Sequence, residues 1–357
     1  MKKRVLVAMS GGVDSSVAAA ILKEQGYEVI SATMKIWPKE FCGMDKERSC
    51  CSLKDIEDAK RVSDKLGIKH YVLNFEKVFR KDVIDYFTSE YLKGRTPNPC
   101  IICNEKIKFG AFLKKALELE CDYIATGHYA RIEKNGRYKL KEAVDKSKDQ
   151  SYVLWTLTQR QLKKVLFPLG ELTKNKVRSI ARDLGLDIYK KPDSQEICFV
   201  PNNDYSSFIK KYCSIKDKEG DIVDISGNVL GKHKGYWNFT IGQRRGLGIA
   251  APRPLYVLEI KPKENVIVAG EAIEVKKKRF TVKDVNWLDS SSLGKVKKAQ
   301  VKIRYNHKKS PAFLKDLGSK RIEIEFKEAQ DAITPGQAAV FYDGEYVLGG
   351  GWIEKAP

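Results

Sequence analysis

The sequence predicts an α/β protein in which an N-terminal doubly wound parallel sheet is followed by a small β-rich domain and a C-terminal antiparallel β-barrel. Apolar, strand-like runs alternate with helical patterns up to about residue 202, which is typical of a parallel sheet with helices on both faces. Short β-branched runs separated by Gly and Lys follow, which indicates antiparallel strands. A length of 357 residues is sufficient for two or three domains. We place the domains at 1–202, 203–275 and 276–357.

The elements of the α/β part follow from its apolar runs and from the glycines that end its helices. Strands are expected at 5–9, 27–34, 70–75 and 121–126, and helices at 17–22, 55–66 and 82–93. Gly67 and Gly94 each follow an expected helix, where glycine commonly terminates the last turn. Because ligands bind at the carboxyl ends of parallel strands, Ser10, Met34 and Gly127 are expected to share one site.

The second half of the chain alternates apolar and polar residues over short stretches. Strands are expected at 220–224, 227–231, 255–260, 265–269, 300–304, 321–326 and 338–342. This period-two alternation predicts half-buried strands. We expect the last three to belong to the barrel.

The stretch Ser10–Ser16, Ser-Gly-Gly-Val-Asp-Ser-Ser, lies between the first expected strand and the first helix. Its glycines let backbone N–H groups approach an anion, and the helix start adds unsatisfied donors. It lacks the lysine of a Walker A loop and so suits a leaving pyrophosphate. It resembles the PP-loop of the ATP pyrophosphatases, an adenine nucleotide alpha hydrolase-like fold, although an ordinary Gly-rich turn is the simpler alternative. We expect Mg²⁺ beside Asp14, no other metal, and ATP contacts from Ala8, Met9, Ser10, Gly11, Gly12, Val13, Asp14, Ser15, Met34 and Gly127.

The net charge of +20 predicts a polyanionic partner. Residues 261–327 hold 18 Lys and Arg against 8 Asp and Glu, so half of the net charge lies there. Such clustering favours nucleic acid, and the alternative is a generally lysine-rich proteome. Lys2–Arg4 precede an apolar run that is too short for a secretion signal or a membrane span. We therefore expect a cytoplasmic protein whose eight cysteines do not form a structural disulfide framework.

Two cysteine motifs are candidates for sulfur chemistry. Thr96–Phe109 contains Cys100 and Cys103 in a Cys-x-x-Cys after two prolines, a spacing found in redox dithiols and in half zinc sites. No second pair with zinc-finger spacing follows. Cys198 stands alone between Ile197 and Phe199, where a buried cysteine is the ordinary interpretation.

Taken together, these motifs resemble the bacterial tRNA-specific 2-thiouridylases, which replace the 2-oxygen of the wobble uridine with sulfur. The resemblance runs essentially end to end and rests on 10–16, 96–109, 126–131, 149–154, 194–200, 239–248, 335–338 and 348–353. It implies Cys103 as the nucleophile and Cys198 as the carrier of a persulfide, with Asp14 as a further catalytic residue. Position 100 is Asp or Cys in this family, so Cys100 fits the pattern without having to be the redox partner of Cys103.

The resemblance also implies cofactors, partners and an order of steps. ATP adenylates the uridine oxygen, and an external persulfide donor, either a sulfur-relay protein or a cysteine desulfurase, supplies the sulfur. The Cys198 persulfide then attacks directly, or Cys103 first releases hydrosulfide. Direct attack ends in a Cys103–Cys198 disulfide that an external reductant resets.

Contacts to the anticodon region of tRNA are implied for a further set of residues. They are Asn98, Pro99, Cys100, His128, Asp149, Gln150, Ser151, Arg304, Tyr305 and Gln337. An Arg beside a Tyr suits phosphate pairing and base stacking. Simpler interpretations remain: a strand-end histidine for His128, a helix N-cap for Asp149, and a solvated strand face for Arg304 and Tyr305.

Three other functions remain open. Cys42, Cys50 and Cys51 could ligate an iron–sulfur cluster with Cys100 or Cys103 in a tRNA thiolase that uses the same ATP activation, although their spacing matches no common cluster pattern. A PP-loop synthase acting on a small molecule would leave the basic C-terminal part unexplained. A non-catalytic RNA-binding protein would leave the combination of Asp14 and the two cysteines unexplained.

Overall fold

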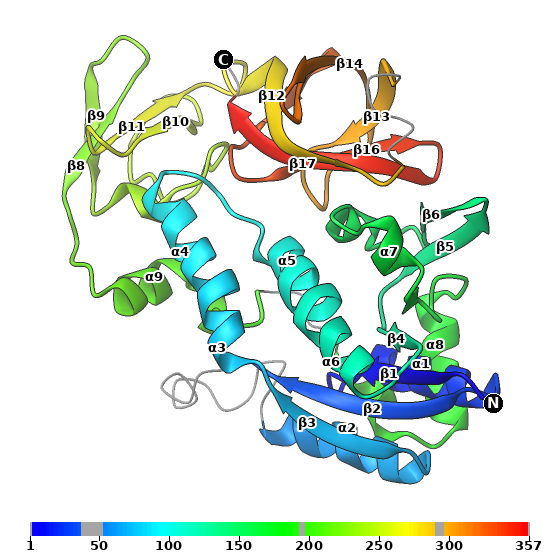
Figure 1. Ribbon diagram of the computed structural model, residues 1–357. Helices are drawn as coiled ribbons and strands as arrows, with labels where there is room; N and C mark the ends of the chain where they lie inside the picture. The colour runs from blue at the N-terminus through cyan, green and yellow to red at the C-terminus, as the bar shows by residue number, and fades with distance from the viewer. Residues whose placement is uncertain (1, 37–52, 193–196, 290–295, 356–357) are drawn as a thin grey trace. The chain divides into compact units, whose positions relative to one another are not determined.

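The computed structural model describes residues 2–36, 53–192, 197–289 and 296–355 (Figure 1). The chain forms two compact units that interleave along the sequence. The first comprises Met1–Val83, Cys100–Asn203 and Glu345–Val347, and the second comprises Ile84–Pro99, Asp204–Gly344 and Leu348–Pro357. The glycine-rich loop, Cys103 and Cys198 therefore lie in the first unit.

The first unit is built on a parallel sheet with strand order β3-β2-β1-β4-β7. Its strands are β1 (Arg4–Ala8), β2 (Glu28–Lys35), β3 (Lys69–Asn74), β4 (Tyr123–Ala125) and β7 (Val165–Leu166). The chain runs from β1 outward to β2 and β3, then returns to place β4 on the other side of β1. The strand order thus reverses between β1 and β4, and α/β sheets bind ligands outside the carboxyl ends of strands at such a point.

Helices cover both faces of this sheet, and Figure 1 shows α2 and α6 on opposite sides of it. The helices of the unit are α1 (Val13–Glu24), α2 (Leu53–Lys65), α3 (Glu76–Phe79), α5 (Pro99–Ile102), α6 (Phe112–Glu118), α7 (Gln159–Leu162) and α8 (Lys174–Asp183). On one face, Val17 of α1, Val62 of α2 and Val177 of α8 join Val5 and Val7 of β1 in one buried core. Among the described residues, no helix is long and apolar enough to cross a membrane.

The Cys-x-x-Cys motif lies on a helical segment, to which the sequence analysis assigned no secondary structure. After α5, a π-helical stretch covers Cys103–Ala111 and continues into α6. Gly110 suits this stretch because a side chain there would lie 2.9 Å from the carbonyl oxygen of Glu105. Long π-helical stretches are rare, and wide turns of this kind are frequent at functional sites.

A hairpin of β5 (Ala130–Asn135) and β6 (Arg137–Glu142) completes the first unit. Tyr346 and Val347, which belong to this unit, pair antiparallel with β6. Arg131 and Lys141 both form ion pairs with Glu345. Three residues from near the end of the chain are thereby attached to the N-terminal fold.

The second unit contains a small mixed sheet with strand order β10-β11-β8-β9. Its strands are β8 (Gly220–Val223), β9 (Val229–His233), β10 (Tyr256–Lys261) and β11 (Val266–Gly270). The expected strands are present, but β11 pairs with β8 in parallel rather than antiparallel fashion. The unit also holds α4 (Asp85–Leu92) and α9 (Tyr205–Cys213), which pack together through the rings of Phe87 and Phe208.

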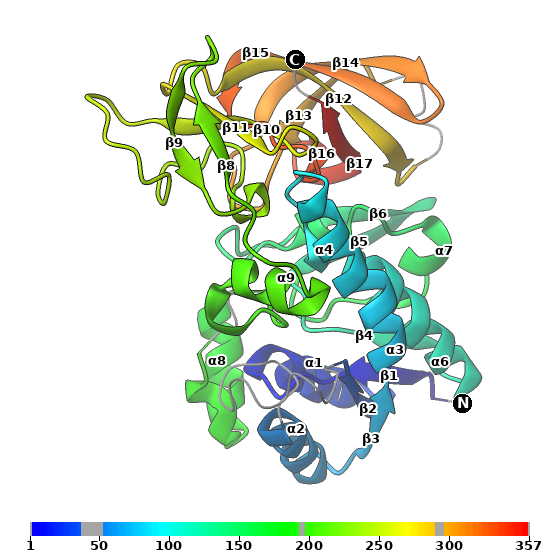
Figure 2. The same ribbon diagram turned by 90° about the vertical axis from the view of Figure 1, so that its left-hand side faces the viewer.

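The predicted C-terminal barrel is confirmed as a closed antiparallel barrel, which Figure 2 shows from a second direction. Its strand order is β12-β15-β14-β13-β16-β17, and pairing of β12 with β17 closes it. The strands are β12 (Lys276–Trp287), β13 (Lys298–Lys302), β14 (Ser310–Gly318), β15 (Arg321–Asp331), β16 (Ala338–Asp343) and β17 (Tyr346–Lys355). Phe280, Phe326 and Phe341 face inward and fill its core. Along each strand, inward-facing apolar residues alternate with outward-facing residues, which produces the alternation seen in the sequence.

Candidate functional site

The glycine-rich loop lies at the point where the strand order of the parallel sheet reverses. Ser10–Gly12 follow β1, and Thr126–His128 follow the neighbouring strand β4. Gly127 lies directly against the loop, since a Cβ atom there would be 2.8 Å from both the carbonyl carbon of Asp14 and the amide nitrogen of Ser15. Only glycine permits this approach, so the structure brings together two segments that the sequence analysis assigned to one ligand.

The loop presents backbone donors at the start of α1. Gly12 precedes the helix in an extended conformation without a side-chain cap. Among the described residues, no acceptor is recorded for the N–H groups of Gly11, Gly12 and Val13. The hydroxyls of Ser15 and Ser16 donate to the Gly12 carbonyl at 3.2 and 2.9 Å and thereby brace the loop from within. Unsatisfied donors at a helix N-terminus form a ready anion site.

Asp14 belongs to a partly buried hydrogen-bond network whose other members no sequence motif predicts. The Lys174 ammonium donates to Oδ1 and Oδ2 of Asp14 at 2.7 and 2.8 Å, and the Tyr129 hydroxyl donates to Oδ1 at 2.8 Å. The Lys174 side chain is 9% exposed and that of Asp14 is 32% exposed. Lys174 begins α8, 160 residues along the chain from Asp14, and no sequence motif marks it.

A second lysine attaches the loop to α2. The Lys191 ammonium donates to the Gly11 carbonyl at 3.0 Å and to the carboxylates of Asp55 and Asp58 at 2.6 and 2.8 Å. Both carboxylates are buried, and these partners raise the pKa of Lys191 despite its partial burial. Gly11 has a φ of +70° and lies against the backbone of Asp55. Lys191 and the start of α2 thus both contact the loop at Gly11.

The two predicted reactive cysteines are both accessible in part. Cys103, at the first position of the π-helical stretch, and Cys198 are half-buried, whereas Cys100 is exposed. Phe199, next to Cys198, is buried and packs its ring edge-on against Phe79 at 5.6 Å between centroids. The roles predicted for these thiols remain predictions.

The predicted iron–sulfur alternative rests largely on positions outside the described residues. Cys42, Cys50 and Cys51 all lie there. Among the residues that the structure does describe, no group of three or more His, Cys, Asp or Glu side chains is arranged to hold a metal ion.

His128 is buried beside the helix that carries Cys103. Its Nδ1 lies 2.7 Å from the Thr126 hydroxyl, and its Nε2 lies 3.4 Å from the Lys108 ammonium. Because an ammonium only donates, we assign Nε2 as the acceptor and Nδ1 as the protonated nitrogen. Burial, followed by the charge of Lys108, holds the pKa of His128 well below its usual range. The ring is therefore a neutral link between the loop after β4 and the Cys103 segment.

The segment Asp149–Ser151 makes internal hydrogen bonds. Asp149 accepts from the backbone of Ala143 at 2.9 Å and from the Ser151 hydroxyl at 2.8 Å. Burial raises the pKa of Asp149 and these hydrogen bonds oppose that rise. Gln150 accepts from the backbone N–H of Tyr129 at 3.0 Å. The segment positions Tyr129, and its predicted tRNA contact remains a prediction.

The remaining predicted tRNA residues lie in the second unit, apart from Cys100. Asn98 is half-buried and Pro99 is buried. Arg304 donates to the Asp331 carbonyl at 3.1 Å, and Tyr305 is 37% exposed with the Lys302 ammonium 5.5 Å from its ring centroid. Arg304 and Tyr305 are thus presented near one end of β13.

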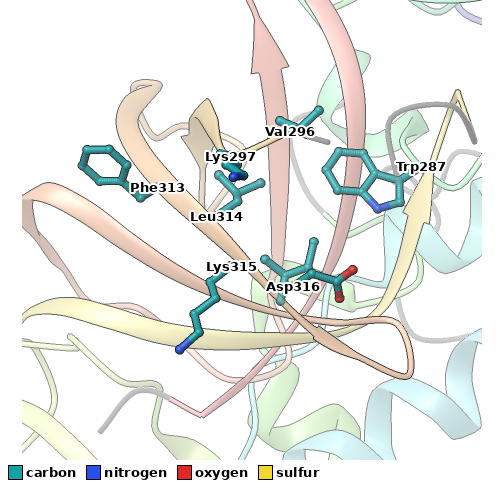
Figure 3. Close-up of a pocket in the computed structure, with 8 residues that line it drawn as sticks. Trp287, Val296, Lys297, Phe313, Leu314, Lys315 and Asp316 are labelled. Atoms are coloured by element: carbon teal, nitrogen blue, oxygen red, sulfur yellow. The ribbon is translucent and has the colours of Figure 1, made fainter. Parts of the chain in front are cut away.

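A hollow of about 450 Å³ opens on the barrel near the start of β13 and along β14 (Figure 3). Trp287 and Phe313 lie on opposite sides of it in this view, with Val296, Lys297 and Leu314 between them. A shallower groove lies beside it, where Lys298 and Lys327 accompany Phe313. Phe313 is 44% exposed and carries the Lys298 ammonium 5.5 Å from its ring centroid. Exposed aromatic rings beside cations suit nucleotide stacking.

The loop, its helix N-terminus and the strand-order reversal define the first unit as a nucleotide-binding domain of the PP-loop class. Three family models match the chain in order: a tRNA methyl transferase HUP domain over residues 3–202, a tRNA methyl transferase PRC-barrel domain over 206–271, and an aminomethyltransferase β-barrel domain over 277–353.

Curated relatives match over the whole chain. The tRNA-specific 2-thiouridylase of Clostridioides difficile is 53% identical over 100% of this chain and 99% of its own length. That of Carboxydothermus hydrogenoformans is 53% identical over 99% and 98%, and that of Caldicellulosiruptor saccharolyticus is 52% identical over 100% and 99%. The chain belongs to the family of tRNA-specific 2-thiouridylases, which confirms the resemblance found in the sequence.

Proposed function

We propose that this protein thiolates the 2-position of the wobble uridine of tRNA in an ATP-dependent reaction. The observation that carries the proposal is the relationship to 2-thiouridylases at 53% identity over the entire chain. The reaction requires a nucleotide site, two reactive thiols and a surface for tRNA.

The first step converts a poor leaving group into a good one. The uridine O2 attacks the α-phosphate of ATP, the bond to pyrophosphate breaks, and O2 becomes part of an AMP leaving group. The donors of Gly11–Val13 are already oriented at the helix start, so they stabilise the departing pyrophosphate without reorganisation. Mg²⁺ arrives with ATP. The single carboxylate of Asp14 fits it, because Mg²⁺ completes its shell with phosphate oxygens and water.

The second step transfers sulfur. The terminal sulfur of a Cys198 persulfide attacks C2 of the activated uridine, and AMP leaves with O2. The Cys103 thiolate then attacks Sγ of Cys198, which breaks the S–S bond and leaves the sulfur on C2. The two cysteines supply the electrons that reduce this sulfur, so they end as a disulfide that an external dithiol must reduce.

The basic barrel is the part of the chain best suited to the RNA backbone. Lys297, Lys298, Lys315 and Lys327 are exposed around the barrel hollow and groove, and no ion pair among the described residues is recorded for them. Unpaired cations beside an exposed Phe313 suit phosphates and an unstacked base. We therefore assign much of the tRNA affinity to this face.

The direct test is incubation with unmodified tRNA, Mg·ATP and a persulfide donor, followed by nucleoside analysis. We expect 2-thiouridine at the wobble position only when ATP and the donor are both present. A matched tRNA with cytidine at the wobble position is the control and should remain unmodified. Thiolation without ATP, or ATP consumption without any thionucleoside, would contradict the proposal.

A further inference from the structure

The Asp14–Lys174 pair is an unexpected arrangement for a carboxylate that has to meet a divalent cation. Both oxygens of Asp14 accept from one ammonium group, and Oδ1 accepts from the Tyr129 hydroxyl as well. Mg²⁺ at this carboxylate would place a second cation beside the first. Two cations on one partly buried carboxylate repel each other, since protein surroundings screen charge less than water does.

The backbone of Lys174 is anchored by contacts other than those of its ammonium. The backbone N–H donates to Asp145 at 2.9 Å, and Thr173 caps the helix by accepting from the backbone of Lys176. The ammonium donates to Asp14 and lies 5.9 Å from the centroid of the Tyr129 ring. From α8 the side chain reaches Asp14, the residue that directly follows the anion-binding donors of Gly11–Val13.

We propose that Lys174 is a second cation of the nucleotide site and that Asp14 exchanges it for Mg²⁺. Without nucleotide, Lys174 neutralises Asp14 and keeps an anionic side chain from repelling incoming phosphates. When Mg·ATP binds, Mg²⁺ takes the carboxylate and the released ammonium pairs with phosphate oxygens. No bond is made or broken and no proton moves. This inference rests on the proposed use of ATP and adds a residue that the mechanism above does not employ.

The exchange predicts that Lys174→Met strengthens the binding of Mg²⁺ but slows the release of pyrophosphate. In Lys174→Met, Mg²⁺ meets no competing ammonium, so the Mg²⁺ concentration for half-maximal binding of a non-hydrolysable ATP analogue should fall about tenfold. The rate of pyrophosphate release should nevertheless fall about 100-fold, because one cation on the developing charge is gone. Lys174→Arg should stay within about threefold of the wild type in both measurements, since it keeps the charge.

Binding of the analogue in EDTA, where no Mg²⁺ is available, measures the contribution of the lysine separately from that of the metal. Asp14→Asn should bind the analogue about tenfold more tightly than the wild type, because the carboxylate no longer occupies Lys174 or repels the phosphates. The double variant Asp14→Asn, Lys174→Met should lose that gain. The matched control is Lys176→Met, an exposed lysine two residues along the same helix, which should behave as the wild type.

The binding measurements use the full chain without tRNA and follow fluorescence anisotropy of the labelled analogue alongside the thermal midpoint. Pyrophosphate release is measured separately, with Mg·ATP and tRNA present. A folded Lys174→Met with an unchanged Mg²⁺ midpoint would overturn the inference, as would an Asp14→Asn variant whose binding in EDTA does not improve. If Lys174→Met fails to fold, the comparison of analogue binding by Asp14→Asn and by the wild type in EDTA tests the inference instead. Failure of the wild type to bind the analogue even with Mg²⁺ would instead contradict the proposed function.

Discussion

The side-chain amide of Gln337 donates to the carbonyl oxygens of Thr96 and Pro97, at 3.0 and 3.1 Å. The backbone N–H of Thr96 in turn donates to the Pro335 carbonyl at 2.9 Å, and Gly336 has no room for a side chain against Thr96. The barrel residues 335–337 therefore hold the chain that leads into Asn98, Pro99 and Cys100. Gln337 has a structural role beside the tRNA contact that the sequence predicts for it.

Gln337→Ala should slow thiolation about tenfold, because the segment that leads into Asn98 and Pro99 loses two hydrogen bonds. Loss of these hydrogen bonds should also lower the free energy of unfolding by ~1–2 kcal/mol. Binding of an ATP analogue should not change. The measurements are the single-turnover thiolation rate and the urea midpoint, with Gln300→Ala, an exposed glutamine on β13, as the control. Equal rates in the two variants would show that the hold on Thr96 is dispensable.

Local sequence patterns predicted the features that short-range interactions determine. They did not predict side-chain partners that are distant in the sequence. The glycine-rich loop between strand and helix, and the alternation along strands such as Arg321–Asp331, follow from short-range rules. Lys174 meets Asp14 across 160 residues, and Gln337 meets Thr96 across 241. Nothing in the neighbourhood of either residue indicates its partner. The parallel pairing of β11 with β8 is likewise a tertiary outcome that alternation alone does not specify.

Cys103→Ala and Cys198→Ala should each eliminate thiolation, because one thiol carries the sulfur and the other closes the disulfide. Cys213→Ala should retain activity, since burial raises the pKa of that thiol and disfavours its thiolate. Activated uridine should still form in Cys198→Ala, because the adenylation step needs only ATP and the bound base. Nucleoside analysis and mass spectrometry of the protein after turnover without reductant provide the readouts.

The same series distinguishes the persulfide mechanism from the iron–sulfur alternative. Cys42→Ala and Cys51→Ala should thiolate at the wild-type rate, and the purified protein should contain no stoichiometric iron. Inactivity of these two variants together with bound iron would favour the cluster.

Replacing Lys298, Lys315 and Lys327 by Gln should weaken tRNA binding and flatten its salt dependence. Each lost phosphate contact should reduce the slope of log K against log salt by about 0.7–0.9. The control replaces three exposed lysines of the first unit, Lys54, Lys60 and Lys69, by Gln. Substitution is preferable to deletion of the barrel, because deletion would also remove residues 345–347 from the first unit. If the slope of log K against log salt is unchanged in the barrel variant, these lysines do not contact tRNA phosphates.

His128 should make the protein less stable in acid. Burial and Lys108 hold its pKa well below 6.5 in the folded state, whereas the unfolded chain takes up a proton near pH 6.5. The unfolded state therefore binds more protons below that pH, and the free energy of unfolding should fall by up to ~1.4 kcal/mol per pH unit for this group.

The measurement is urea unfolding between pH 5 and 7.5. His128→Gln should reduce the pH slope without abolishing it, because burial also lowers the pKa values of His70, His233 and His307. An identical slope in the variant would mean that His128 is protonated equally in both states.

Asp14→Asn should nearly abolish ATP-dependent pyrophosphate release while leaving tRNA binding intact, because the loop loses the one carboxylate that meets Mg²⁺. The substitution also removes the Asp14 carboxylate from its ion pair with the buried Lys174 ammonium. The free energy of unfolding should therefore fall by ~1–3 kcal/mol, less than for a fully buried pair because Asp14 is partly exposed. In the double variant with Lys174→Met, most of that stability should return, whereas pyrophosphate release should not. Release assays at saturating Mg·ATP and tRNA, with thermal unfolding of the same samples, separate the two effects. Wild-type release by Asp14→Asn would remove this carboxylate from the reaction.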